Sequence, residues 1–276
     1  MKTVLLFTAA SILASATASA APTDFTASGV VPADIQATVT AFNTAISLGG
    51  GNNGAGGGVF LTGRREINWD AAGLDAFQSP NTMPDNFFNN NSKRGSVQHS
   101  PFGSVKVSKR LADSTGKFGD VDASYNASFK TFSALRLFGV TGSNIVENTF
   151  FVPNTPGQEA SINGFGAVFT DVDIAGSSAI EFYGPGNTFL RRIDVPVSAD
   201  GLSFAGTFFG DGERITAVRI IAGNIGMGPG VLDGVGTDVV AMDDFFYSEP
   251  LAIPAPATLG LIGVGLVAGG RRRRVK

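Results

Sequence analysis

The spacing of apolar residues near the start of the chain predicts one amphipathic helix. Between residues 33 and 47 apolar side chains recur every three or four positions, which places them on one face of a helix. Glycines at 49–51 follow, and glycine is typical of the positions where a helix ends. We therefore expect a helix over roughly residues 33–47 with one face packed on the rest of the fold. That face comprises Ile35, Val39, Phe42 and Ile46.

Beyond residue 58 the pattern changes to short runs of alternating, β-branched or aromatic residues separated by clusters of Gly, Pro, Asn and Asp. Turn signals every ~8–12 residues are typical of a sandwich or barrel. Residues 70–126 are richer in Asn, Ser and Gly, so we expect long loops over most of that segment. The expected strands are 59–62, 65–69, 104–108, 145–152, 165–174, 179–183, 189–197, 202–209, 215–222 and 239–247. The prediction is a mainly β protein: a jelly-roll-like β-sandwich over residues 21–250 with one N-terminal helix.

The first twenty residues have the pattern of a secretion signal. One charge, Lys2, precedes an apolar stretch over 4–13, and small residues then end in Ala18-Ser19-Ala20. A basic start, an apolar middle too short to span a bilayer and an Ala-x-Ala exit predict cleavage by signal peptidase. Residues 1–20 are therefore expected to be removed, so that the mature chain begins at Ala21. A buried N-terminal helix is the alternative.

The C-terminal segment predicts a short membrane-spanning helix. Residues 251–270 are uncharged and almost wholly apolar, and a cytoplasmic stop follows at once. The uninterrupted apolar part, 257–270, is shorter than the ~20 residues that a spanning helix needs. Such a helix is a marginal anchor and suits temporary retention. The stop consists of Arg271, Arg272, Arg273 and Arg274.

The same segment resembles the PEP-CTERM sorting domain that exosortases of Gram-negative bacteria recognise. That domain combines a Pro-x-Pro motif, an apolar helix and a basic cluster, and here the motif is Pro254-Ala255-Pro256, with Ala255 where the family usually has Glu. The resemblance covers residues 251–276. It implies cleavage near the motif by an exosortase-like protease and transfer to the cell surface or the exopolysaccharide. A plain C-terminal membrane anchor is the alternative.

Three phrases of the ectodomain resemble a domain that recurs in PEP-CTERM proteins and has no assigned activity. They are residues 64–70, residues 87–92 with Arg94-Gly95, and residues 240–245. The segment Met242-Asp243-Asp244-Phe245 also resembles the last strand of jelly-roll carbohydrate-binding modules.

Composition limits the partners. Lys2, the four tail arginines and Lys276 lie outside the ectodomain, so 14 basic residues remain against 23 acidic ones, a net charge of −9. An acidic surface argues against nucleic acid as a partner. The chain has no cysteine, so an exported form relies on its core without disulfides.

The residue types present in the chain are compatible with few catalytic mechanisms. The single histidine, His99, excludes a multi-histidine zinc site, and we expect it in a solvated loop. A glycoside hydrolase needs only two carboxylates a few ångströms apart. The candidates include Glu66, Asp70, Glu147, Glu181 and Glu213. Nothing in the sequence pairs them, so a hydrolase stays an alternative.

Aromatic side chains are candidate sugar platforms. Trp69 is the only tryptophan and is our tentative ligand-binding residue, although a lone Trp in a strand is more often part of the core. The other candidates are Tyr125, Tyr183 and Tyr247.

Acidic residues in two predicted strands suggest a cation site. Alternation places Asp171 and Asp173 on one face of a strand, whereas adjacency places Asp243 and Asp244 on opposite faces. A buried carboxylate needs an arginine, backbone N–H groups or a cation to compensate it. We therefore name these four residues as tentative ligands of Ca²⁺, with ordinary hydrogen bonding as the alternative.

These patterns together predict an exported protein with an inner-membrane intermediate that is then located at the cell surface, at the outer membrane or outside the cell. The expected partners are signal peptidase, an exosortase-like protease, the membrane and, as a candidate ligand, a polysaccharide. A non-catalytic surface or extracellular-matrix protein is the favoured function. A secreted glycan-active hydrolase with a carboxylate pair is the alternative, and a purely structural matrix protein differs only in lacking a ligand.

Overall fold

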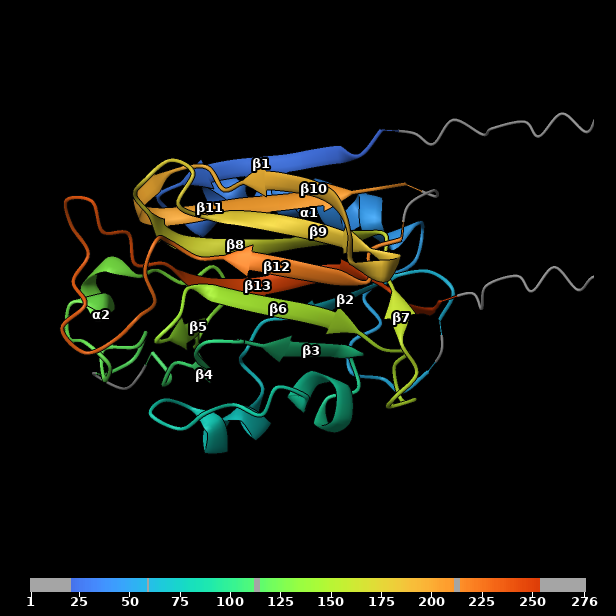
Figure 1. Ribbon diagram of the computed structural model, residues 1–276, viewed down its shortest axis with the longest axis horizontal. Coiled ribbons are helices and arrows are strands. Elements are labelled where there is room, and N and C mark those ends of the chain that lie inside the picture. Colours follow the sequence, from blue (N-terminus) through green and yellow to red (C-terminus); the bar gives the residue numbers. More distant parts are fainter. Residues whose placement is uncertain (1–20, 59, 112–114, 211–213, 254–276) are drawn as a thin grey trace, which may run out of the picture.

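The computed structural model describes residues 21–58, 60–111, 115–210 and 214–253, and it consists mainly of two antiparallel sheets packed as a sandwich (Figure 1). The larger sheet contains β1 (Thr23–Gly29), β2 (Arg64–Ile67), β4 (Ser104–Val107), β5 (Phe138–Thr141), β8 (Gly164–Val172), β11 (Ser198–Phe208) and β13 (Ala241–Ser248). Its strand order is β1-β11-β8-β13-β5-β4, and β2 pairs with another part of β13. The predicted mainly β class, the sandwich and the N-terminal helix are confirmed.

The smaller sheet lies in front of the larger one in Figure 1. It contains β3 (Ser96–His99), β6 (Ile145–Phe150), β9 (Ala179–Gly184), β10 (Thr188–Asp194) and β12 (Ala217–Ile221), in the order β10-β9-β12-β6-β3. A two-stranded ribbon joins β7 (Ala160–Ser161) and β14 (Leu251–Ala252). Short helical segments are α2 (Tyr125–Ser128), Ala72–Phe77, Phe87–Asn91 and Pro185–Asn187.

Eight of the strands from β5 to β13 form nested antiparallel pairs, and successive pairs alternate between the two sheets. The innermost pair, β9 with β10, is in the smaller sheet, and the next pair, β8 with β11, is in the larger one. The pair β6 with β12 returns to the smaller sheet, and β5 with β13 to the larger. The chain from β5 to β13 thus winds as one long folded hairpin.

Aromatic side chains fill much of the space between the sheets. Trp69 is 1 % exposed and stacks on Phe138, with a ring separation of 4.2 Å, while Phe245 meets its edge at 5.0 Å. Phe165 continues the cluster 5.5 Å from Phe245. Each aromatic ring removes a large apolar area from water, so this cluster holds the sandwich together without disulfides.

Helix α1 (Pro32–Ser47) forms where the periodicity predicts it. Proline suits its first turn, and the Asp34 carboxylate accepts hydrogen bonds from the N–H groups of Val30 and Val31 at 2.8 and 3.0 Å. The helix ends at Leu48, which adopts a left-handed conformation with φ 47°. Local signals at both ends therefore define the helix.

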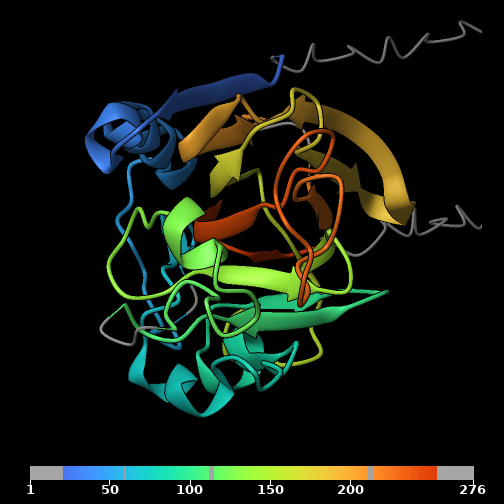
Figure 2. The same cartoon turned by 90° about the vertical axis from the view of Figure 1, so that its left-hand side faces the viewer.

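The helix packs on the outer face of the larger sheet, as Figure 2 shows. Its predicted apolar face is buried against the side chains of Val168, Leu202, Phe204 and Phe246. Gly166 makes room for this contact, since a Cβ there would lie 3.0 Å from the ring of Phe42. The sheet is thus covered on both faces.

Each strand predicted from residue 145 onward is present, and the strands predicted at 65–69 and 104–108 correspond to β2 and β4. The predicted strand at 59–62 is wrong: residues 60–62 form a loop in which Leu61 is 80 % exposed. The prediction does not include strands β1, β3, β5, β7 and β14. These strands are short or lie near sheet edges, so hydrogen bonds to neighbouring strands define them more than their own pattern does.

Candidate functional site

The predicted export and sorting residues lie outside the described residues. This applies to Ala18 and Ala20, to Pro254, Ala255 and Pro256, and to Arg271, Arg272, Arg273 and Arg274. Ala21 is the first described residue and is exposed. In the part of the chain that the structure describes, no helix has the length and apolar character required to cross a membrane.

Trp69 belongs to the core and not to a ligand-binding surface. Its Nε1 donates a 2.7 Å hydrogen bond to the main-chain oxygen of Asp243, and rings of Phe88, Phe138 and Phe245 surround it. An indole buried to this degree offers no face to a sugar. The structure therefore replaces the sugar-platform expectation with the core interpretation.

Asp243 and Asp244 are held by hydrogen bonds. The Asp243 carboxylate accepts from the N–H groups of Phe132 and Ser133 at 2.6 and 3.2 Å, and the Ser133 hydroxyl donates to Asp244 at 2.6 Å. A register shift between Met242 and Phe245 interrupts strict alternation, so both carboxylates reach Ser133 instead of lying on opposite faces. Burial, followed by repulsion from Asp244, raises the pKa of Asp243 well above its usual value.

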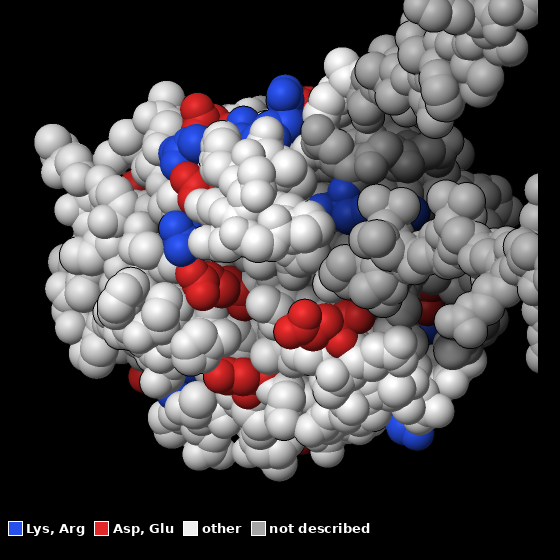
Figure 3. All heavy atoms as spheres, turned by 45° about the vertical axis from the view of Figure 1, so that its right-hand side comes forward, with Lys and Arg blue, Asp and Glu red and all other residues white. Residues whose placement is uncertain are grey.

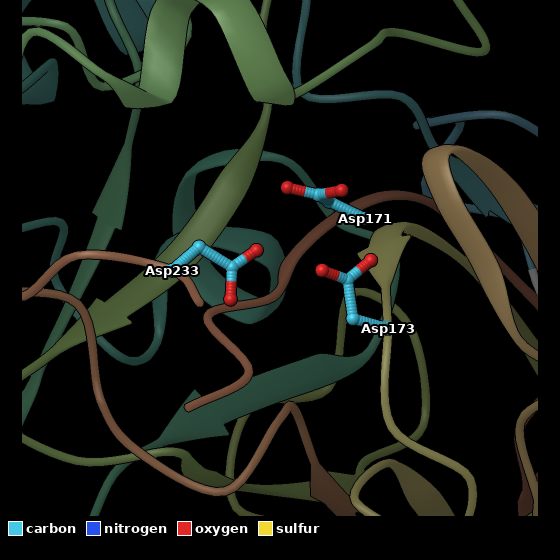
Figure 4. A group of neighbouring side chains, drawn as sticks. All are labelled: Asp171, Asp173 and Asp233. Atoms are coloured by element: carbon cyan, nitrogen blue, oxygen red, sulfur yellow. The ribbon is translucent and has the colours of Figure 1, made fainter. Parts of the chain in front are cut away.

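Asp171 and Asp173 come together with Asp233, which the sequence analysis did not select. Figure 4 shows the three side chains, and one carboxylate oxygen from each lies within 4.8 Å of the other two. We call these three residues the acidic cluster. Asp243 and Asp244 do not join it. The Asp-Gly pair at Asp233 marks a turn that the sequence could have shown. Its contact with Asp171 and Asp173, about 60 residues earlier in the chain, could not be read from it.

A second feature is a row of charged side chains across the outer face of the smaller sheet. Strand register aligns Arg192, Glu181, Arg219, Glu147 and His99, one from each strand. The Arg219 guanidinium lies 2.8 Å from Glu147 and 3.8 Å from Glu181, and Arg192 lies 3.1 Å from Glu181. In Figure 3 acidic and basic side chains lie side by side on this surface. We call these five residues the charged row.

Next to the charged row the surface forms a shallow groove. Tyr183, Arg219 and Glu147 line one end, in a pocket of about 150 Å³, and Phe151, Glu159 and Ile253 line the other, in a pocket of about 270 Å³. The residues common to both pockets are Thr149, Asn187 and Ala217. The small side chains of Thr149 and Ala217 leave this depression between longer neighbours.

Tyr183 links the groove to the charged row. Its hydroxyl donates a 2.7 Å hydrogen bond to Glu181, Arg219 lies over its ring at 5.5 Å, and Phe189 meets its ring at 5.8 Å. Burial, followed by the hydrogen bond to Glu181, raises the pKa of the Tyr183 phenol. The phenol is therefore a neutral hydrogen-bonding group, and part of its ring lines the groove.

Two of the carboxylates considered for a hydrolase belong to the charged row, and one of them, Glu147, also lines the groove. Glu147 and Glu181 both pair with Arg219, which lies between them in the register. A glycosidase places the sugar bond between its two carboxyl groups. Here the Arg219 guanidinium fills that position. The predicted loop position of His99 is wrong, because His99 is the last residue of β3; its half-exposed side chain pairs with Asp85 at 2.7 Å.

Comparison of the sequence with protein-family models finds no match, and comparison with curated proteins finds no significant match.

Proposed function

We propose that the protein is exported, sorted to the cell surface or extracellular matrix, and binds a polysaccharide there without cleaving it. The sequence of the two chain ends supports export and sorting. The observation that supports polysaccharide binding is the groove on the outer face of the smaller sheet. It combines an aromatic ring, carboxylates, a guanidinium and an amide on one accessible surface.

These groups match the chemistry of a sugar. Hydroxyl groups donate and accept hydrogen bonds, so Glu147 and Glu159 suit them as acceptors, and Arg219 and Asn187 suit them as donors. The ring of Tyr183 supplies an apolar surface for sugar C–H groups. The alternating signs of the charged row, within an ectodomain of net charge −9, favour a neutral polysaccharide over a strongly anionic one.

We interpret the sandwich as jelly-roll-like. The nested pairs from β9/β10 outward to β5/β13 support this, because two four-stranded sheets wound from a folded hairpin are characteristic of that architecture. The other strands extend the two sheets at their edges.

The geometry of the chain ends is compatible with attachment at one end. Register places Thr23 beside Phe208, and Phe208 beside Gly164 at the start of β8. The ribbon of β7 and β14 lies at this same end in Figure 1. An anchor that follows β14 would therefore leave the opposite end of the sandwich facing outward.

The test is a glycan array with the purified ectodomain, followed by calorimetric titration of the best glycan into variants. We expect Y183A to weaken binding about tenfold or more, as for an aromatic anchor. The control is F102A, which removes a 76 % exposed ring outside the groove and should leave affinity unchanged. Absence of glycan binding, or equal affinity of Y183A and the unaltered protein, would refute the proposal.

A further inference from the structure

The acidic cluster lies at the end of the sandwich opposite to Thr23. Asp171 and Asp173 flank the end of β8, and Asp233 comes from the connection between β12 and β13. Asp171 has φ 68° and lies opposite a register shift in β11, where residues 199–201 bulge. The bulge brings the N–H of Asp200 within 2.7 Å of Asp171 Oδ1.

One oxygen of the cluster lacks a hydrogen-bond donor. Asp171 is 2 % exposed, and among the described residues no N–H or hydroxyl group donates to its Oδ2. A proton shared between the Asp171 and Asp233 carboxyl groups is the alternative to a bound cation. Buried carboxylate oxygens are normally satisfied, and an unsatisfied one is costly. In Figure 4 the carboxylate of Asp171 faces the space that Asp173 and Asp233 also face. A positively charged group in that space would compensate the three carboxylates and satisfy the Asp171 oxygen.

The neighbouring side chains do not supply this group. Within the described parts of the chain, no arginine, lysine or histidine forms an ion pair with a member of the cluster. The charged groups that most affect the cluster are its own members, Asp200 and Asp238. Asp238 is buried and already accepts hydrogen bonds from the N–H groups of Asp173 and Ile174. Burial, followed by this repulsion, raises the pKa of Asp173 to about 6.

We propose that the acidic cluster binds one Ca²⁺ ion. Calcium takes six to eight oxygen ligands at about 2.3–2.6 Å, so two ligands on opposite sides of the ion lie roughly 4.6–5.2 Å apart. The three ligand oxygens of the cluster all lie within 4.8 Å of one another, so one ion can contact all three. Mg²⁺ keeps several water ligands and usually binds through only one or two carboxylates, and Zn²⁺ prefers nitrogen and sulfur, so three carboxylates favour Ca²⁺. Water molecules complete the coordination.

The ion has a structural role. It connects the end of β8 to the glycine-rich connection before β13, and it satisfies Asp171 Oδ2. The connection contributes Asp233, whose Oδ1 also accepts hydrogen bonds from the N–H groups of Gly234 and Val239. Calcium therefore fixes a loop at the end of the sandwich that faces away from the chain ends.

Two features make the proposal testable against simple protonation of the cluster. Calcium should stabilise the protein at pH 7.5 and have less effect at pH 5, where protons compete for the same carboxylates. Without calcium, D233N should be more stable than the unaltered protein, because it removes one of three repelling charges. With calcium, the order should reverse, because D233N loses a ligand.

The experiment is a thermal melt of the mature protein with excess CaCl₂, with EGTA, or with MgCl₂ in EGTA. At about a hundredfold excess over the dissociation constant we expect calcium to raise the midpoint by roughly 5–10 °C. D173N and D233N should lose most of this response, whereas the control D194N, whose side chain is 61 % exposed and lies in β10 of the smaller sheet, should keep it. Superimposable melts in CaCl₂ and EGTA, an undiminished response in D233N, or an equal response to Mg²⁺ would each overturn the assignment.

Discussion

The ion pair between Arg65 and Glu249 gives the most direct test of how the interior is built. Arg65 is completely buried and Glu249 is 4 % exposed. The guanidinium donates to both carboxylate oxygens at 2.6 Å, so the pair is bidentate. Arg65 also donates to the main-chain oxygens of Gly54 and Gly56 at 2.7 and 3.0 Å. One side chain thus joins β2, the end of β13 and the glycine-rich loop.

R65A leaves the Glu249 carboxylate buried without its partner. Breaking a buried ion pair from one side costs about 3–5 kcal/mol. The control is R64A in the same strand, where Arg64 and Glu66 form an ion pair with side chains 23 % and 26 % exposed. A pair in that setting contributes at most about 1 kcal/mol. In a domain of this size the midpoint moves by about 2–4 °C per kcal/mol, so R65A should lose roughly 6–20 °C and R64A no more than ~4 °C.

The assay is urea unfolding followed by circular dichroism, with the unfolding free energy extrapolated for each variant. A loss in R65A no larger than in R64A would refute the reasoning. R65M combined with E249M separates charge burial from packing, because two apolar side chains remove the unpaired charge and should recover most of the stability. If the double variant is as unstable as R65A, the loss arises from the loop contacts and not from the carboxylate.

Three further predictions follow from other parts of the molecule. Because the pKa of buried Asp171 is raised to about 6, the calcium-free protein should lose about 2 kcal/mol of unfolding free energy as the pH rises from 4 through about 6. A melting midpoint in EGTA that increases over this pH range would contradict the sign. F42A should cost about 3–5 kcal/mol in urea unfolding, because Phe42 is fully buried between α1 and the sheet; the exposed-face control T40A should cost under about 1 kcal/mol. N-terminal sequencing of the exported protein should begin at Ala21, and deletion of residues 271–276 should abolish orderly membrane retention; retention of Met1 or normal processing of the truncated chain would contradict these two expectations.

The local sequence pattern was sufficient to predict helices and strands whose own residues show a clear periodicity or clear end signals. Helix α1 has a four-residue apolar face and end signals on both sides, so its position was predictable to within about a residue at each end. Long strands such as β8 and β13 were recognised from their aromatic and β-branched residues. Strand β1 was not, because only Phe25 and Ala27 alternate in it and its hydrogen bonds come from β11.

The candidate sites required contacts between distant segments. Asp171 and Asp173 were selected from their alternation, but Asp233 and the unsatisfied oxygen of Asp171 became visible only when the loop before β13 met the end of β8. Asp243 and Asp244 had an equally acidic sequence, and the register shift in β13 gave them backbone donors instead. Which carboxylate is compensated, and by what, depends on neighbours that the local pattern does not encode.

By itself, the sequence determined the fold class and the helix with its buried face, and it predicts export and sorting signals at the two chain ends. The tertiary structure decided that Trp69 is a core residue, that the charged row aligns across five strands, and that Arg65 meets Glu249. The physical reason is range: periodicity and end signals act within a few residues along the chain, whereas burial and charge pairing depend on segments that only folding brings together.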